Sequence, residues 1–230
     1  MEDLAMRLAQ TQVFGKLRQA ECLELASVAS HRRVEAGEFL CHQGQAWTRF
    51  VYLAAGQLRW VLLSVSGREY VVAELKPAAI FWGHSFFDDQ PMPACLQAID
   101  VSEVYEWSRA AVQPILLRNP SALWEVTKDL VRMMRRSREI IYGLAFQPVA
   151  GRLANLLLNQ FPAQDNPSIE RSITLSEIAS RIATSPEVVS RLLHQFESEG
   201  IVEINRASIT LSDRSALEQL ANSQDKWKRE

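Results

Sequence analysis

The sequence predicts an α+β protein with a β-rich N-terminal half, one long central helix and a helical C-terminal unit. Between Gly37 and Trp107, short runs rich in Val, Tyr, Phe and Trp alternate with turn residues such as Gly56. From Ser121 the apolar residues follow a helical period, and no proline interrupts it before Pro148. The chain has 230 residues, of which 47% are hydrophobic, so it is long enough for two domains.

The N-terminal domain is assigned to residues 1–112. Its first thirty residues have helical spacing that is interrupted near Gly15, which predicts short helices. The β-rich stretch that follows is typical of an all-β sandwich or barrel.

The long helix lies in a region assigned to residues 113–147, with Ser121 as its expected N-cap. Steps of four and three residues place seven positions on one stripe: Leu123, Thr127, Leu130, Met134, Ser137, Ile141 and Leu144. This spacing is typical of a coiled-coil seam between two chains, although a core helix of one monomer shows a similar stripe. We predict a homodimer through these residues.

The third region, residues 148–230, contains two short helices joined by a tight turn. Thr174 and Glu177 form a capping box before the first helix, and Ser185 precedes Pro186 as the expected N-cap of the second. The second helix places its apolar residues on one face: Val189, Leu192, Leu193 and Phe196. Two alternating runs around Asn205-Arg206 predict a hairpin. Together these elements describe a winged helix-turn-helix, whose second helix enters a DNA major groove.

The polar residues at the start of the second helix are the predicted base contacts: Ser185, Glu187, Ser190 and Arg191. An arginine can donate two hydrogen bonds to guanine O6 and N7, and a glutamate can accept one from cytosine N4. An ordinary surface ion pair between Glu187 and Arg191 is the competing interpretation. Their place in the first two turns favours base contact. We expect phosphate contacts from Thr174, Ser176, His194 and Arg206.

The overall charge excludes a non-specific nucleic-acid binder. The chain has 25 Lys and Arg residues against 27 Asp and Glu residues, for a net charge of −2. Residues 148–230 carry nine basic and eleven acidic residues. Attraction for phosphates must therefore be local, with help from the six basic residues between positions 118 and 147.

Residues 173–211 resemble the winged helix-turn-helix of the CRP/FNR family of bacterial transcription regulators. The segment "PVAGRLANLLL" is similar to the helix that leads into that unit, and "EAGEFLCHQGQAWTRFVYLAAGQLRW" is similar to the opening of the family's sensor domain, with Gly37, Gly44 and Gly56 at its turns. The resemblance covers about residues 14–220. It implies a jelly-roll-like β-roll sensor domain, a dimerisation helix and a palindromic double-stranded DNA target, with RNA polymerase as a further partner, as for an activator.

The segment "EVVSR", Glu187 to Arg191, is similar to the E-x-x-S-R pattern of the branch that resembles the fumarate and nitrate reduction regulator. This similarity implies half-sites like TTGAT. The chain departs from the family pattern at Ala183, where a glycine is common, and at Pro186, where an arginine is frequent.

The effector is expected to differ from cAMP. Where the family's cAMP-binding members have a Gly-Glu pair and an Arg-Ser pair, this chain has Gly83-His84 and Pro93-Ala94. The guanidinium that binds the cyclic phosphate is therefore missing, and Asp88 and Asp89 add repulsion. Four residues are the candidate effector pocket, for an apolar or planar molecule: Trp82, His84, Phe86 and Phe87.

Two alternatives remain open. His84 could be an axial haem ligand, which would make the protein a haem- or NO-responsive regulator. A different class, a cupin-like metalloenzyme, needs histidines and a carboxylate that converge, and the sequence has no H-x-H pair among its four histidines: His31, His42, His84 and His194. We expect no catalytic residues and no metal site.

The cysteines and the hydropathy indicate a reduced, cytoplasmic protein. Three scattered cysteines supply neither a disulfide framework nor the four ligands of an iron–sulfur cluster: Cys22, Cys41 and Cys95. No apolar run approaches the ~18 residues of a membrane span, and no export signal precedes the first helix.

Overall fold

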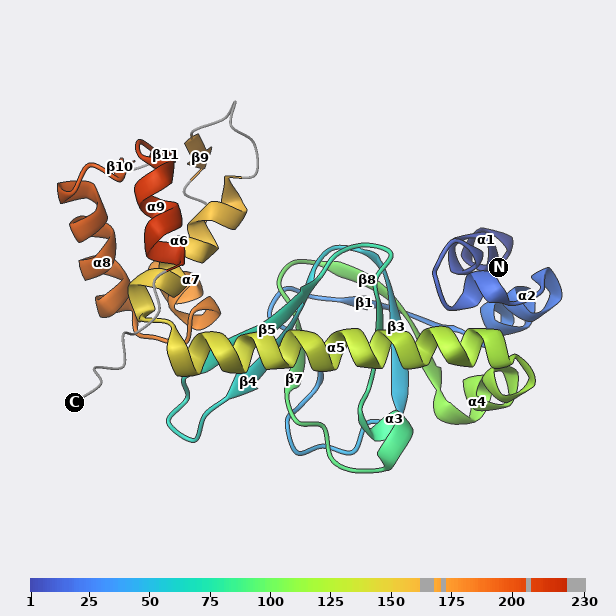
Figure 1. Cartoon of the computed structure of the whole chain (residues 1–230). Coiled ribbons are helices and arrows are strands. Elements are labelled where there is room, and N and C mark those ends of the chain that lie inside the picture. The colour runs from blue at the N-terminus through green and yellow to red at the C-terminus, as the bar shows by residue number, and fades with distance from the viewer. Residues whose placement is uncertain (162–167, 171–172, 206–207, 223–230) are drawn as a thin grey trace. The chain divides into compact units, whose positions relative to one another are not determined.

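The computed structural model describes residues 1–161, 168–170, 173–205 and 208–222. Contacts divide the chain into two compact units, residues 1–67 with 71–136 and residues 68–70 with 137–230. The predicted α+β class is confirmed, because a β-sheet domain, one long helix and a helical C-terminal domain follow one another along the chain (Figure 1). In the part of the chain that is described, no helix is long and apolar enough to cross a membrane.

Short helices open the chain, as predicted: α1 (Glu2–Ala9), the 3-10 helix η1 (Phe14–Lys16) and α2 (Gln19–Ser27). The buried Glu21 carboxylate fixes the start of α2, because it accepts hydrogen bonds from the Arg18 backbone N–H at 3.0 Å and the Arg18 guanidinium at 3.0 Å. The Asn119 amide donates a third at 2.9 Å. These bonds, that of the Arg18 guanidinium first, lower the pKa of Glu21 to about 2.

Two four-stranded sheets form the β domain. The first has the order β1 (Ser30–Val34), β8 (Ser102–Ser108), β3 (Arg49–Ala55) and β6 (Ile80–Trp82). The second has the order β2 (Phe39–Cys41), β7 (Cys95–Ala98), β4 (Leu58–Leu63) and β5 (Glu69–Leu75). Gly56 turns the chain from β3 into β4 with a positive φ of 85°, and a Cβ there would collide with the Ser102 side chain.

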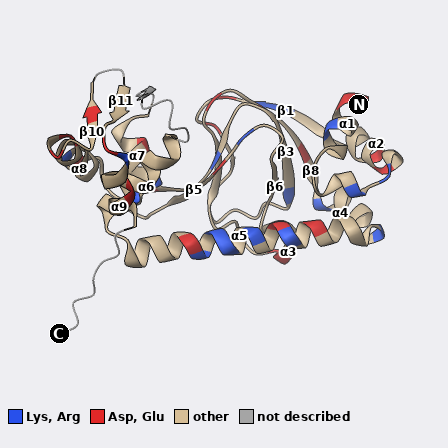
Figure 2. Ribbon diagram, turned by 45° about the horizontal axis from the view of Figure 1, so that its top comes forward, with Lys and Arg blue, Asp and Glu red and all other residues tan. Residues whose placement is uncertain are grey.

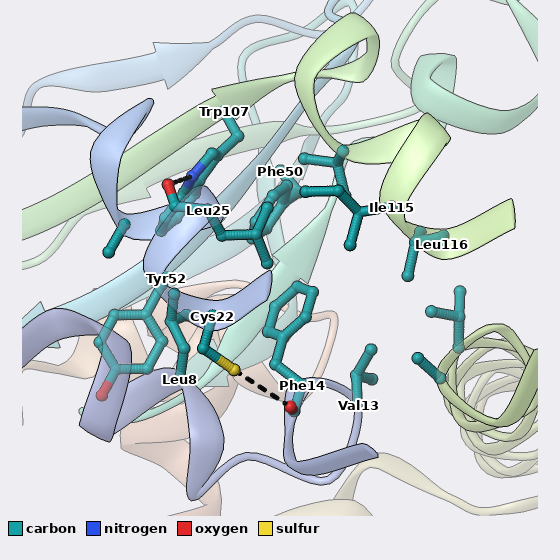
Figure 3. Close-up of a cluster of buried hydrophobic side chains, with 14 of the residues drawn as sticks. Leu8, Val13, Phe14, Cys22, Leu25, Phe50, Tyr52, Trp107, Ile115 and Leu116 are labelled. Atoms are coloured by element: carbon teal, nitrogen blue, oxygen red, sulfur yellow. Dashed lines mark hydrogen bonds between the residues drawn. The ribbon is translucent and has the colours of Figure 1, made fainter. Parts of the chain in front are cut away.

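Alternation along the strands fills two separate cores. On β6, Phe81 joins the core between the sheets, whereas Trp82 joins a second core under the N-terminal helices. In the second core the rings of Phe50 and Trp107 stack with centroids 4.4 Å apart (Figure 3). The Trp107 indole N–H donates to the Leu25 carbonyl at 2.8 Å, which ties β8 to α2.

Helix α3 (Ser85–Asp88) follows β6, and α4 (Arg109–Arg118) follows β8. The sequence did not predict α4, because Pro114 lies inside it. Helix α5 (Pro120–Phe146) starts two residues before the first helical position that an N-cap at Ser121 implies, so Ser121 lies in its first turn and is not its N-cap. Proline suits that place, since a first-turn N–H has no partner within the helix.

The C-terminal unit contains α6 (Val149–Gln160), α7 (Leu175–Arg181), α8 (Pro186–Ser198) and α9 (Arg214–Ala221). The predicted hairpin is present as β10 (Val202–Ile204) and β11 (Ser208–Leu211), paired antiparallel. A third strand, β9 (Ser168–Glu170), pairs with the outer side of β11. The prolines and the Asp-Asn pair of the segment "PAQDNPS" predict a loop that includes Ser168, but Ser168 is the first residue of β9, so the prediction is wrong at that residue.

Candidate DNA-binding site

The capping box before α7 is confirmed. The Thr174 hydroxyl accepts from the Glu177 backbone N–H at 3.2 Å, and the Glu177 carboxylate accepts from the Thr174 backbone N–H at 2.7 Å. The same carboxylate accepts from the Thr174 hydroxyl at 2.9 Å. Thr174 is exposed, as is Ser176 in the first turn of α7, so both predicted phosphate contacts lie on the surface at the α7 N-terminus.

The turn between α7 and α8 is tight and strained. Ala183 has a φ of 53°, in the left-handed region that favours glycine. The Thr184 N–H donates to the Ala179 carbonyl at 3.1 Å, which closes the turn. Sequence reasoning missed Arg152 of α6, whose Nε donates to the Ile182 carbonyl at 2.9 Å and whose Nη1 donates to the Gln147 carbonyl at 2.8 Å. Arg152 therefore connects the turn to the chain that enters α6.

Helix α8 has the two faces that the sequence predicted. Its apolar face is buried against α7 and α6 in one core that includes Val189, Leu192, Leu193 and Phe196. On the opposite face Glu187, Arg191 and His194 are exposed, and Ser190 is half-buried beside them. Burial of the apolar face therefore fixes the orientation of the polar face.

The charged pair on this face is not the ion pair that the sequence offered as an alternative. Within the described part of the chain, Arg191 makes neither a hydrogen bond nor an ion pair. Glu187 instead accepts a hydrogen bond from Ser185, which with a bond from its own backbone N–H lowers the pKa of Glu187. Ser185 occupies the predicted N-cap position, but its side chain makes no capping bond. The Ser185 hydroxyl, which was expected to cap α8, interacts with the Glu187 carboxylate instead.

The hairpin is attached to α8 through Glu197. Its carboxylate accepts from the Ile204 backbone N–H at 3.2 Å and lies 3.6 Å from His194 Nδ1. At the tip, Asn205 Oδ1 accepts from the Ser208 N–H at 2.7 Å. The predicted phosphate contact Arg206 lies outside the described residues.

The predicted seam of α5 lies largely on the surface of the single chain. Met134 and Ile141 are 71% and 64% exposed. Leu123, Thr127 and Leu144 are also exposed, and Ser137 is half-buried. Leu130 differs, because it packs against the core under the N-terminal helices together with Ala122 and Val126. The rest of the helix carries more basic than acidic residues, with Lys128 and four arginines between positions 132 and 138 against Glu125, Asp129 and Glu139 (Figure 2).

The candidate effector residues divide into two sets. Trp82, Phe86 and Phe87 contact one another, with ring centroids 5.0 to 5.8 Å apart, and the first two belong to the core under the N-terminal helices. His84 instead packs on Trp60, which sequence reasoning did not single out, with centroids 4.9 Å apart. Burial lowers the pKa of His84. Haem binding by His84 stays a hypothesis from the sequence.

Of the two acidic residues that were expected to repel an anion near His84, one is paired with a basic residue. Asp89 lies 2.5 Å from Arg109 in an ion pair, so its charge is compensated and only Asp88 still supports the argument from repulsion. Among the described residues, no group of three His, Cys, Asp or Glu side chains is arranged to hold a metal ion. The three cysteines are buried free thiols.

Two family models match this chain. The cyclic nucleotide-binding domain matches residues 31–119, and the Crp-like helix-turn-helix domain matches residues 151–220. The cAMP-activated global transcriptional regulator CRP of Salmonella typhimurium is 26% identical over 177 residues, covering 75% of this chain and 84% of the relative. The Cyclic AMP receptor protein of Thermus thermophilus is 26% identical over 202 residues, covering 87% of this chain and 93% of the relative.

Solved structures share the fold. A CooA variant from Carboxydothermus hydrogenoformans has a TM-score of 0.74 at 23% identity and covers 94% of this chain and 99% of its own. A transcriptional regulator of the CRP/FNR family from Thermus thermophilus has a TM-score of 0.66 at 18% identity and covers 85% of this chain and 100% of its own. Between them the two family models span more than half of the sequence, and together with the relatives they show that this chain belongs to the CRP/FNR family of DNA-binding transcription regulators.

Proposed function

We propose that this protein regulates transcription as a homodimer that binds a palindromic operator, with one α8 in the major groove of each TTGAT-like half-site. The observation that carries the proposal is the N-terminal face of α8, where Arg191 is exposed and has no partner within the described residues. An arginine in this state can donate two hydrogen bonds to a guanine without first breaking an ion pair. Glu187 lies one turn before it, already held by Ser185.

The exposed stripe of α5 supports the homodimer. Met134 and Ile141 expose large apolar side chains to water on a helix whose other apolar face, at Ala122 and Val126, is buried in its own unit. A second copy of the stripe is the complement that heptad spacing favours. Two copies of α8 on a two-fold axis explain a palindromic site, with half-sites about 34–36 Å apart.

We further propose that an effector other than cAMP controls operator binding. The two relatives described above are cAMP regulators by name, but here Pro93 and Ala94 offer no side-chain donor for a cyclic phosphate. RNA polymerase is the expected partner at the promoter, and the cytoplasm, where bacterial DNA lies, is the expected place of action. In titration calorimetry cAMP should give no saturable heat, and a micromolar dissociation constant would contradict this part of the proposal.

Selection of binding sites from random DNA tests the proposal as a whole. The full chain should enrich a pseudo-palindrome whose two halves resemble TTGAT. The matched variant Arg191→Ala should enrich a site with a degenerate G·C position. Enrichment of a single asymmetric site, or of no sequence, would overturn the proposal.

A further inference from the structure

Trp60 and His84 contact each other between the two sheets of the β domain. Trp60 lies on β4 of the second sheet, opposite Leu96 on β7. His84 follows β6, the edge strand of the first sheet, and precedes α3. Their ring planes are inclined by 31°, and the rings of Trp60 and Phe81 are T-shaped with centroids 5.8 Å apart. The contact between Trp60 and His84 therefore connects β4 with the residues that follow β6.

Each of these two rings buries a polar atom that lacks a partner. Trp60 is only 7% exposed, and within the described residues neither its Nε1 nor His84 Nδ1 makes a hydrogen bond. A buried polar atom without a hydrogen bond destabilises the fold, and here two such atoms belong to rings in contact. Trp82 Nε1 is also without a partner, but its ring neighbours, such as Phe50 and Phe86, bring no second polar atom.

The chemistry of the two atoms defines the group that would satisfy both. The indole N–H is only a donor, so it requires an acceptor. Desolvation lowers the pKa of His84 and favours the neutral imidazole, and in the tautomer protonated at Nε2 its Nδ1 is an acceptor that requires a donor. An acceptor and a donor side by side on an uncharged group are the edge of an amide or lactam.

We propose that Trp60 and His84 form the effector site, and that the effector is a neutral, planar molecule whose amide or lactam edge accepts from Trp60 Nε1 and donates to His84 Nδ1. Its regulatory role rests on the proposed function, whereas the binding itself does not. Flat ligands suit the aromatic surroundings of Trp60 and Phe81. An anion is disfavoured, because the negative charge of the Asp88 carboxylate acts on the imidazole.

The position of this site gives it a connection to α5. Trp60 and Phe81 belong to the core between the sheets, and Met133 of α5 packs against that same core. The next residue, Met134, belongs to the exposed stripe. An effector that reorders Trp60 would therefore act on the helix that carries the proposed dimer seam.

The test uses 2-quinolone, a planar lactam, as the probe and follows the indole N–H signals of the full-length protein by ¹H–¹⁵N NMR. Trp60→Phe assigns the Trp60 signal among the six tryptophans. We expect 2-quinolone to shift this signal saturably, while the signal of Trp107, whose indole N–H already donates to the Leu25 carbonyl, stays in place as an internal control. N-methyl-2-quinolone lacks the N–H donor, so its dissociation constant should be higher by about tenfold or more. His84→Phe should weaken binding of 2-quinolone to a similar degree, and His84→Gln should restore it.

The inference would be overturned by the absence of a saturable shift with 2-quinolone, or by equal binding of its N-methyl derivative. It would also be overturned if the Trp60 N–H exchanged its hydrogen with a bound water and did not respond to the lactam. The comparison of the two quinolones needs no variant, so it holds even where a substitution unfolds the domain. Operator binding by gel shift is measured separately. Lactam binding without operator binding would defeat the proposed function alone, and operator binding without lactam binding would defeat this inference alone.

Discussion

Met134→Glu should convert the protein from a dimer to a monomer. Met134 lies at the middle of the exposed stripe of α5, and it belongs to none of the buried cores that the described residues form. Leu130, the neighbouring stripe residue, is a poorer choice, because it packs against the core under the N-terminal helices and its replacement would disturb the fold.

The magnitude follows from the exposed fractions. The four large apolar residues of the stripe together expose the equivalent of about two whole side chains per chain: Leu123 37%, Met134 71%, Ile141 64% and Leu144 43%. Full burial of one such side chain contributes roughly 1.5–3 kcal/mol, so the loss of Met134 from both chains removes about 3 kcal/mol. This corresponds to a dissociation constant about 100-fold higher, before the repulsion between two facing carboxylates is counted.

Sedimentation velocity across a concentration series measures this constant. The matched control is Trp124→Glu, since Trp124 is 62% exposed on the same helix but lies outside the stripe. The control should remain dimeric while Met134→Glu sediments as a monomer with an unchanged circular dichroism spectrum. Equal dissociation constants for wild type and Met134→Glu, or equal dissociation of both variants, would refute the reasoning.

Three further predictions concern stability. Glu21 has a pKa of about 2 against an ordinary 4.5, so it stabilises the fold above pH 4.5 and that contribution is lost as the pH falls towards 2. Glu21→Gln should therefore lower the melting temperature at pH 7, and the melting temperature of the variant should fall less than that of the wild type as the pH is lowered. An equal fall for both proteins would contradict this. Ala183→Gly should raise stability by up to about 1 kcal/mol in urea titrations, because it relieves the positive φ, and a loss would show that the turn is not strained. Thr174→Ala should cost about 1 kcal/mol in the same titrations, and no change would mean that the capping box is dispensable.

Local sequence signals were sufficient for the helices that carry the candidate site. Helix α8 was predictable because its apolar positions recur with helical spacing and Pro186 marks its first turn. The side-chain hydrogen bond of Ser185 was not predictable, because a serine at this position can bond either to a backbone N–H or to a nearby carboxylate. In the structure the Ser185 side chain interacts with the Glu187 carboxylate.

Contacts between distant segments had no such signal. Strand β9 has only three residues and pairs with β11, some forty positions later. Trp60 and His84 are neighbours only because the two sheets stack on each other, with β4 in one and β6 in the other. Periodicity describes which face of a strand is buried, and it does not define what that face will meet.

The most direct test of base reading by α8 is a double-mutant cycle between Arg191 and one G·C pair of the selected operator, measured by fluorescence anisotropy at fixed salt. For the wild type, changing that pair to A·T should cost about 1–3 kcal/mol. For Arg191→Ala the same base change should cost less than about 0.5 kcal/mol. His194→Ala, on the same exposed face, should bind every sequence more weakly and keep the wild-type discrimination. If Arg191→Ala discriminates between the two base pairs as the wild type does, Arg191 does not read the base and the account is wrong.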